Sequence, residues 1–488
     1  MCIRDRFSLG SSLDGWLKDR GEAICVGRSW LPLLSPSLAT ASAFAIGESQ
    51  AALSVALDLT DQGELEHYRF CLTQICPDAT VDQDALEALA HRKPKARTTP
   101  AALKPLKAQI TVLEQLVKVT TVLRERRLQA GSIDLNLPMP PLERLGDLLE
   151  PPPDGSRQGW LLEHDTSHPA ALLREAILVA GRALGRHFTA LELPALFAIN
   201  PPAEAAEINE VAKTALALEL PLELSADGNA SAAELAAAFA GTDRSRALQQ
   251  QLRDCLRPVQ LSEEPDVHAM AGEPEALAPW CCPTLHYADI WNQQLLVTLL
   301  VHGKDRPTVR HKSGLDLASD SCHGAIEWAL LTPTQLGAFQ EARRQGLVQR
   351  LNGRSRLLGE FQADALAMAQ ARHAEPLVGR SLPGVISGVQ SYGFFVEVPP
   401  SQVEGLVHVS SLRDDWYEYR SRQNRLVGRK SRRTYMVGDP VEVDIQKVDA
   451  LRHQIDLAVL QPELSEADTP SQPGDDEADG ESVDGTEA

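Results

Sequence analysis

Hydrophobic and polar positions alternate most regularly between residues 382 and 460. Alternation with a period of two is typical of β-strands that bury one face. The pattern predicts five short strands within about eighty residues, at 385–389, 392–398, 404–410, 441–448 and 454–460. Short strands at this spacing are typical of a small closed barrel.

The second predicted strand carries aromatic side chains on both of its faces. Alternation turns Phe394, Val396 and Val398 toward a core and leaves Phe395 on a mixed, solvent-facing surface. The same count turns His408 of the third strand outward. Exposed rings of this kind stack the bases of single-stranded nucleic acid. The alternative is that the rings serve only to pack the barrel.

A long connection between the third and fourth predicted strands is strongly basic, with no acidic residue between its first and last cation. Its cations are Arg420, Arg422, Arg425, Arg429, Lys430, Arg432 and Arg433. Phosphate groups are attracted to such cations, and exposed aromatic rings lie nearby in the chain. The region therefore predicts a site for single-stranded nucleic acid.

Three strings in this region resemble the RNA-binding OB-fold module named after ribosomal protein S-one, at residues 384–389, 405–410 and 438–441. In that family the outward aromatic residues and the histidine contact RNA. The resemblance therefore implies that Tyr392, Phe395 and His408 bind RNA, and that Phe394 belongs to the core.

Before residue 380 the hydrophobic period is mainly that of a helix. Helices are predicted at 80–90, 103–128, 168–187, 203–218 and 231–239. Another is predicted with Pro283 in its first turn, and a helical stretch at 333–373, broken near Asn352 and Gly353, is predicted to link the two halves. Apolar runs at 51–59 and 64–72 predict a hairpin, and 133–137 predicts a strand. The predicted fold class is α+β, a mixed helical and β domain followed by a five-stranded OB-fold barrel.

Charge is distributed very unevenly along the 488 residues. The formal net charge is −20, but ten acidic residues and no basic one lie between residue 463 and the C-terminus. This tail cannot bury enough apolar surface to order itself, so we expect it to be disordered. The residues before the tail repel nucleic acid less than the total net charge suggests, because the charge near a site, and not the total, decides whether nucleic acid binds there.

Cysteine usage and hydropathy bear on the compartment. The eight cysteines are scattered without a Cys-x-x-Cys pair, which fits a reducing cytoplasm better than a disulfide scaffold or a zinc site. The sequence lacks an apolar run long enough for a membrane span and a signal-peptide core at its first residues. We therefore expect a cytoplasmic protein, acting as a monomer without a membrane partner.

Glu175 is a carboxylate on an apolar helix face. Residues three and four positions away on either side are Ala171, Leu172, Leu178 and Val179. A functional role is one interpretation. The alternative is a glutamate that reaches water or pairs with a nearby cation.

The region from about residue 11 to 332 resembles the catalytic domain of the ribonuclease II and ribonuclease R family. The segments that carry the resemblance are 12–14, 31–32, 52–55, 126–128, 133–135, 175–177, 200–202 and 283–289. It implies hydrolytic, Mg²⁺-dependent degradation of single-stranded RNA from the 3′ end. It also implies that Glu175 helps to place the terminal nucleotide, and that Asp134 and Asp289 occupy family positions, Asp289 being equally compatible with a structural role.

The chain departs from the family pattern at three places. The family binds its metal through an aspartate cluster, and no such cluster occurs in residues 1–59, so no metal ligand is assigned. The family's Ser-Pro-Ile-Arg-Arg-Tyr motif reads Cys-Pro-Thr-Leu-His-Tyr at residues 282–287, which puts Leu285 and His286 where the arginine pair stands. A neutral imidazole does not replace a guanidinium fork. Val81 stands where the family has a tyrosine near the RNA terminus.

These observations predict a domain order. Residues 1–6 resemble an assembly artefact and suggest a truncated N-terminus. A partial catalytic-type domain is expected at 7–332 and a helical linker at 333–378. The OB-fold RNA-binding domain is expected at 379–460 and the acidic tail at 461–488. The leading hypothesis is a 3′-to-5′ exoribonuclease whose metal-binding segment is missing from this chain. The alternatives are a catalytically impaired relative that binds RNA, and an RNA-binding module on an unrelated helical scaffold.

Overall fold

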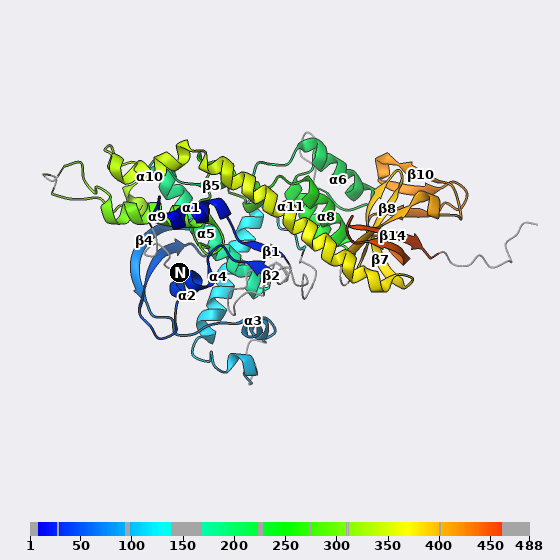
Figure 1. Ribbon diagram of the computed structural model, residues 1–488, viewed down its shortest axis with the longest axis horizontal. Coiled ribbons are helices and arrows are strands. Elements are labelled where there is room, and N and C mark those ends of the chain that lie inside the picture. Colours follow the sequence, from blue (N-terminus) through cyan, green and yellow to red (C-terminus); the bar gives the residue numbers. More distant parts are fainter. Residues whose placement is uncertain are drawn as a thin grey trace, which may run out of the picture.

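The computed structural model describes residues 8–26, 29–92, 98–137, 168–222, 228–273, 275–308, 310, 312–399 and 402–460. In these residues the molecule is elongated, with a mixed helical and β body at one end and a barrel at the other (Figure 1). The expectations for residues 1–6 and for the acidic tail lie outside the described residues. No described helix is both long and apolar enough to cross a membrane.

The body is built from helices around three two-stranded sheets. Its helices are α1 (Ser12–Arg20), α2 (Pro36–Ser42), α3 (Gln83–Ala90), α4 (Ile110–Gln129), α5 (Pro169–Ala190), α9 (Tyr287–His302) and α10 (Pro333–Arg344). Its antiparallel strand pairs are β1 (Ile24–Val26) with β2 (Ser29–Leu31), β3 (Gln50–Leu59) with β4 (Leu65–Ile75), and β5 (Phe197–Ile199) with β6 (Gln260–Ser262). The predicted hairpin at 51–72 is therefore confirmed.

Helix α5 is the central element of the body. Its buried Leu184 and Phe188 share one hydrophobic core with Tyr287 and Trp291 of α9. At Gly185 a Cβ atom would lie 2.6 Å from the carbonyl oxygen of Ala276. Only glycine at this position therefore allows the backbone at Ala276 to pack so closely against α5. The close approach fixes the position of α5, and with it the position of Glu175.

The barrel has the five strands that the alternation predicts. They are β7 (Ser381–Gln390), β8 (Gly393–Val398), β9 (Val403–His408), β13 (Pro440–Asp449) and β14 (Gln454–Val459). They close in the order β13-β14-β9-β8-β7, with β14 and β9 parallel and the other pairs antiparallel. Phe394, Val396 and Val398 are buried and Phe395 is not, as the period of two requires.

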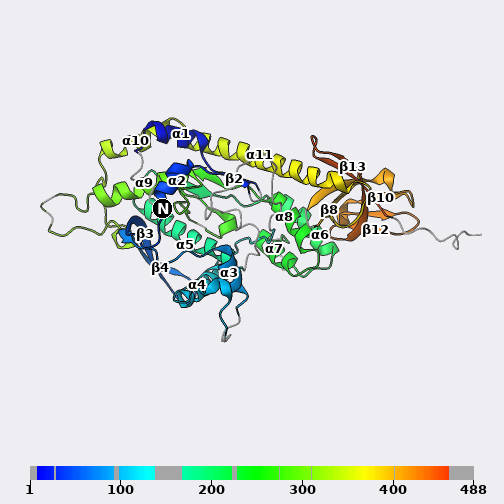
Figure 2. The same ribbon diagram turned by 60° about the horizontal axis from the view of Figure 1, so that its bottom comes forward.

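Three helices between the body and the linker belong structurally with the barrel. These are α6 (Ala205–Ala217), α7 (Ala232–Ala240) and α8 (Ser245–Cys255). Phe239 and Leu248 from these helices share a core cluster with Phe394 and Leu457 of the barrel. Figures 1 and 2 both show α6 and α8 beside the barrel. Helix α8 was not predicted from the sequence, because its polar residues outnumber its apolar ones.

The basic connection is not a loop, which corrects the sequence interpretation. It contains β10 (Tyr417–Arg420), β11 (Arg425–Gly428) and β12 (Thr434–Met436), which form a three-stranded sheet in that order. This insert sheet packs on the barrel through Tyr435 of β12, whose ring stacks on Phe394 of β8 with centroids 4.7 Å apart. Within the insert sheet, Tyr417 of β10 meets the same ring at 5.4 Å. The orientation of the insert sheet relative to the barrel is therefore set by buried aromatic contacts.

The linker is one long helix, α11 (Leu347–Ala374), which contacts α1 and β6 of the body and β9 and β13 of the barrel. The predicted break near Asn352 and Gly353 is wrong. The chain turns instead at Gly346, whose φ of 73° lies in the left-handed region that glycine tolerates. Asn352 instead joins α11 to β6, because its side-chain amide forms two hydrogen bonds of 2.8 Å with the backbone of Leu261.

Three further expectations are corrected. The helix expected to start around Pro283 begins at Tyr287, since Leu285 N donates to Cys282 O (2.9 Å) and closes a turn first. Residues 133–137 form no strand, although Ile133 N donates to Met270 O and holds the segment in place. The helix expected from residue 103 begins only at Ile110.

Candidate nucleic-acid interface and buried carboxylate site

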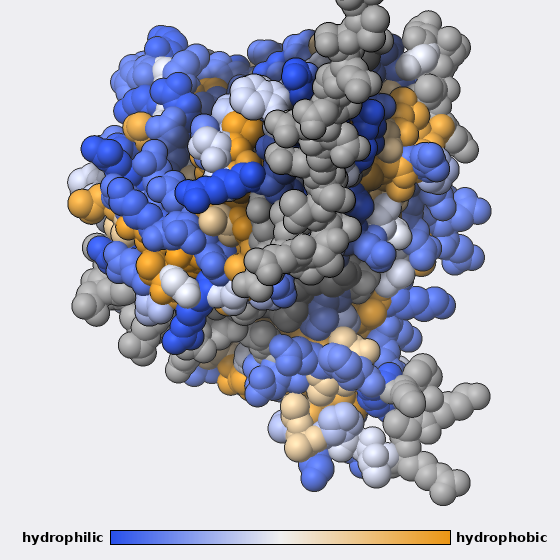
Figure 3. Space-filling view, turned by 90° about the vertical axis from the view of Figure 1, so that its right-hand side faces the viewer, coloured by the Kyte–Doolittle hydropathy of each residue, from blue (hydrophilic) through white to orange (hydrophobic). Residues whose placement is uncertain are grey.

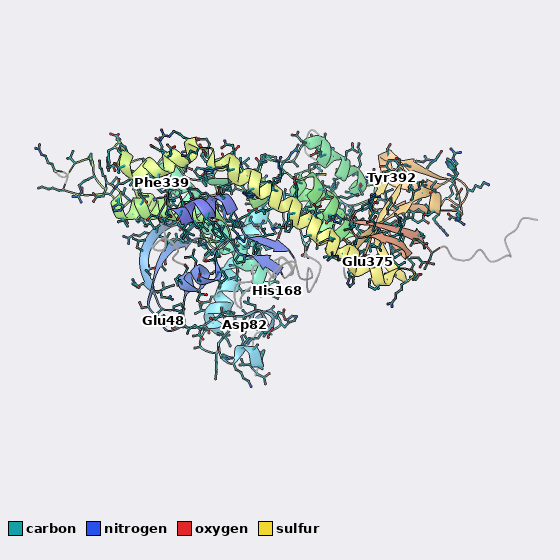
Figure 4. All side chains as sticks on the ribbon, in the orientation of Figure 1. Glu48, Asp82, His168, Phe339, Glu375 and Tyr392 are labelled. Atoms are coloured by element: carbon teal, nitrogen blue, oxygen red, sulfur yellow. The ribbon has the colours of Figure 1, made fainter. Side chains whose placement is uncertain are left out.

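The outward face of β8 and β9 brings together the three side chains predicted to bind RNA. Phe395 and His408 lie on the same face, since Phe395 pairs with Leu406 and Gly393 with His408. Tyr392 precedes β8, is 46% exposed, and meets Phe395 edge to face at a centroid distance of 6.4 Å. Figure 4 labels Tyr392 at the barrel end of the molecule. Their role in binding stays a prediction.

Gly393 allows β8 to approach β9 closely. A Cβ atom at residue 393 would lie 2.2 Å from the carbonyl oxygen of Val407, so no larger residue fits without moving β9. The glycine therefore sets how closely the strand that carries Phe395 packs on the strand that carries His408.

Hydrogen bonds select the tautomer of His408. Its Nδ1 accepts from Ser410 N at 3.2 Å and lies 2.7 Å from Ser410 Oγ. A neutral imidazole that accepts on Nδ1 carries its proton on Nε2. The ring therefore offers a hydrogen-bond donor that suits a phosphate or base oxygen.

The other end of the same face is acidic and partly covered by α8. Arg246 of α8 binds Glu397 of β8, with Nε 2.5 Å from Oε1. Glu404 of β9 bonds to Ser387, and burial raises the pKa of its carboxyl group. These two carboxylates distinguish this end of the face from the end that carries Tyr392 and His408.

Acidic residues just ahead of the basic connection neutralise part of it. Glu418 binds Arg429 at 2.6 Å and lies 3.7 Å from Arg420, and Asp414 binds Arg433 at 3.0 Å. Arg425 is half-buried in β11, and the side chain of Arg422 lies outside the described residues.

Lys430 and Arg432 are exposed, and no ion pair is recorded for either in the described part of the chain. Among the members of the predicted basic set whose side chains the structure describes, these two are exposed and have no carboxylate partner.

The Glu175 carboxylate is fully engaged by an arginine inside the body. Arg127 of α4 approaches it with both arms of its fork, Nε to Oε2 at 2.9 Å and Nη2 to Oε1 at 2.8 Å, and donates to Ser132 Oγ at 2.9 Å. Both residues are buried. Burial alone would lower the pKa of Arg127, but the hydrogen bonds and charge of Glu175 raise it instead.

The cation that pairs with Glu175 was left unidentified by the sequence interpretation, and the structure shows it to be Arg127. The structure thus shows the alternative interpretation of Glu175, a glutamate paired with a cation, whereas its role toward a nucleotide stays a prediction. No local sequence pattern identifies this partner, because the two residues lie 48 positions apart.

Asp134 extends this pair into a network. Arg124 Nε lies 2.8 Å from one of its oxygens, Arg174 Nη2 lies 3.3 Å from the other, and Arg127 Nη2 is 3.7 Å away. Asp134 is itself largely buried. Its position therefore serves to hold three arginines in place.

An open cavity of about 410 Å³ lies over this network. Its charged lining residues are Arg126, Arg127, Arg182, Arg186, Glu175 and Glu273. Each of the arginines has a glutamate partner, since Glu64 lies 2.8 Å from Arg126, Glu273 binds Arg182, and Glu275 lies 3.8 Å from Arg186. An anion that enters must compete with carboxylates that are already present.

A second cavity, of about 310 Å³, is lined by His286 of the degenerate family motif but not by Leu285. Leu285 is 7% exposed and packs inward, while His286 Nδ1 lies 3.5 Å from Glu22. Burial opposes protonation of His286, but Glu22 and Asp289 raise its pKa. Neither residue presents a guanidinium to this cavity.

Asp289 is buried and lines the same cavity, and its role at the family position stays a prediction. It accepts a hydrogen bond from Cys282 N at 2.7 Å, and burial raises the pKa of its carboxyl group. Val81, at the position of the family tyrosine, packs against the small core of α3 and α4. Within the described ranges no three His, Cys, Asp or Glu side chains are arranged to hold a metal ion.

Comparison with known proteins agrees with both halves of the architecture. The RNB domain matches residues 3–302, and the S1 RNA binding domain matches residues 375–460. The acetazolamide conferring resistance protein zam of Synechocystis is 30% identical over 454 residues, covering 92% of this chain and 56% of that protein. Ribonuclease R of Escherichia coli is 42% identical over 86 residues, or 18% of this chain and 11% of that protein.

Two solved structures share the fold. Mycoplasma genitalium RNase R in complex with ribose methylated single-stranded RNA aligns with a TM-score of 0.68 at 15% identity, over 94% of this chain and 65% of that one. Yeast Ssd1, described as a pseudonuclease, aligns with a TM-score of 0.57 at 15% identity, over 86% of this chain and 46% of that one. The chain spans little more than half the length of the zam protein. Because the RNB match covers most of its residues, the chain belongs to the RNB-domain family of the ribonuclease II and ribonuclease R type.

Proposed function

We propose that this chain binds single-stranded RNA on the outward face of its barrel, as part of a protein that degrades RNA hydrolytically from the 3′ end. The observation that carries the proposal is the outward face of β8 and β9, on which Tyr392, Phe395 and His408 lie together. The exposed Lys430 and Arg432 of the insert region add cations to the same domain. The RNase R structure with single-stranded RNA supports the same substrate class.

The proposed division of labour follows the predicted domains. Residues 379–460 bind RNA, 333–378 link the halves, and 7–332 receive the strand near Glu175. The core that α6, α7 and α8 share with the barrel argues that these helices move with the RNA-binding part. We further propose that the protein acts as a monomer in the cytoplasm, which sedimentation at increasing concentration and cell fractionation test.

Mg²⁺ is the cofactor implied by the family. The described residues do not fit it, because no three suitable ligands converge among them. We therefore derive no cleavage step from these residues. The part of the proposal that they support is binding and positioning of RNA.

A second candidate is a catalytically impaired family member that binds RNA without cutting it. Buried Leu285 and the pairing of His286 with Glu22 favour it, since the arginines that would hold a phosphate are absent from this motif. The fold similarity to a protein described as a pseudonuclease is compatible with it. Loss of one positioned electrostatic donor typically costs about 10² to 10³ in rate.

The deciding experiment gives the protein 5′-labelled single-stranded RNA with and without Mg²⁺. Retention of full-length label together with saturable binding supports RNA binding by the residues present. Stepwise shortening from the 3′ end, dependent on Mg²⁺, would show that this chain cuts RNA. Phe395→Ala must weaken binding, whereas Phe361→Ala, which alters a 46% exposed ring on α11, must not.

A further inference from the structure

Trp416 is the most exposed aromatic side chain recorded in the described ranges, at 70%. It precedes β10 and is followed by Tyr417, which is buried against Tyr435. Because adjacent residues of an extended segment point to opposite sides, the contact that buries Tyr417 turns Trp416 outward. The exposure is therefore a consequence of how the insert sheet packs on the barrel.

The backbone that carries Trp416 is held by one carboxylate. Asp415 accepts hydrogen bonds from Trp416 N (2.7 Å), Lys430 N (2.8 Å), Ser431 N (2.7 Å) and Ser431 Oγ (2.8 Å). Burial acts against ionisation, but these hydrogen bonds lower the pKa of Asp415 to about 2. The carboxylate is therefore charged at neutral pH and fixes the corner in which the indole stands.

The same corner joins the backbone of Trp416 to a basic segment. Arg429 N donates to Trp416 O at 3.0 Å, and Asp415 binds the amides of Lys430 and Ser431. Arg429 is paired with Glu418, whereas Lys430 and Arg432 are exposed. An exposed ring and exposed cations on neighbouring segments are the combination that holds a base and its phosphate.

We propose that this corner, formed by residues 415–416 and 429–432, is a second contact for single-stranded RNA, in which a base stacks on Trp416 and a phosphate meets Lys430 or Arg432. The proposal rests on the proposed function, because it extends RNA binding from the barrel face to the insert sheet. Mostly hydrophilic side chains with smaller apolar patches make up the barrel end that faces the viewer in Figure 3. Such a surface suits a charged strand better than a large apolar partner.

The two contacts are close enough for one RNA strand. Trp416 follows His408 by eight positions, which limits the distance between their Cα atoms to about 28 Å. The insert sheet contacts the barrel at β7 through β11 and β12, and Figure 1 shows β10 at the barrel end of the molecule. An OB fold binds about 4 to 16 nucleotides. A long oligonucleotide is therefore expected to reach both contacts, and a short one only the barrel face.

The test compares Trp416→Ala and Trp416→Phe with the unaltered protein on oligouridylates of about 4 and about 16 nucleotides. Trp416→Ala is expected to weaken binding of the long RNA about tenfold and to leave the short RNA within about twofold, whereas Trp416→Phe retains most of the affinity. The salt dependence should not change, since no cation is removed. Trp16→Phe, a substitution of a 43% exposed indole on α1, is the matched control.

A second measurement reports on the ring itself. RNA should protect tryptophan fluorescence from quenching by acrylamide in the unaltered protein, and that protection should be lost in Trp416→Phe. If Trp416→Ala binds long RNA as the unaltered protein does, while Phe395→Ala is weakened, the second contact is refuted and the barrel face stands. If Phe395→Ala has no effect, or the unaltered protein binds no RNA, both proposals fail. A Trp416→Ala defect seen only with anionic vesicles would assign the corner to a lipid surface and overturn the proposal.

Discussion

The barrel end and the Glu175 cavity both gather arginines, but they hold them in opposite ways. In the body every arginine at the cavity has a carboxylate partner, and the Arg127–Glu175 pair is buried. At the barrel end, in contrast, Lys430 and Arg432 are exposed and have no carboxylate partner in the described part of the chain. The difference indicates that charges in the body maintain the structure, whereas charges at the barrel are available to a ligand. Changes in the body should therefore alter stability, and changes at the barrel should alter RNA binding.

The largest expected effect is on the buried pair. Glu175→Ala leaves Arg127 charged, buried and without its main partner, which should lower the free energy of unfolding by about 3–5 kcal/mol. Glu64→Ala, which removes the partner of surface Arg126, should cost less than about 1 kcal/mol. Urea titration measures both. Equal effects would refute the contrast between a buried and a surface pair.

The stability of the body should depend on pH because of a histidine pair. Nδ1 of His187 lies 3.1 Å from Nε2 of His323. Burial lowers the pKa of His187 to about 4, and burial also lowers the pKa of His323. A lowered folded-state pKa means that the stabilisation is complete above about pH 6.5 and is lost as the pH falls toward the folded-state value. Between pH 6.5 and 5, His187 should contribute a loss of about 2 kcal/mol in unfolding free energy. His187→Gln should flatten this dependence, and an unchanged pH profile would count against it.

At the barrel, Phe395→Ala is expected to weaken binding of single-stranded RNA about tenfold, because one stacking platform is lost. The slope of log affinity against log salt should stay the same, since no charge is removed. Fluorescence anisotropy at several salt concentrations measures both quantities. A large change in the slope would show that Phe395 does not act by stacking.

The smallest expected effect separates free cations from paired ones. Replacing Lys430 and Arg432 with glutamine should lower the salt slope by about 1.4, the value for two contacts to single-stranded nucleic acid. The same replacement of Arg429 and Arg433 should change it less, because Glu418 and Asp414 already neutralise them. Identical slopes in the two double variants would contradict the assignment of free and paired cations.

Local patterns in the sequence determined the barrel strands, the β3–β4 hairpin and most helices. A period of two or of 3.6 residues is visible within one element, because burial on one face imposes it directly. The outward positions of Phe395 and His408 follow from the same rule. The resemblance to the RNB and S1 families was also readable, since it depends on the order of short motifs along the chain.

Contacts between distant residues were decided only by the tertiary structure. Arg127 and Glu175 are 48 residues apart, and Arg246 and Glu397 are 151 apart, so no local pattern joins them. The insert sheet was hidden because its strands have three or four residues, too few for a period to show. Which arginines are paired, which are free, and why Trp416 faces solvent depend on how that sheet packs. The sequence thus determined the elements and the residue types, and packing decided which of their charges and rings remain available.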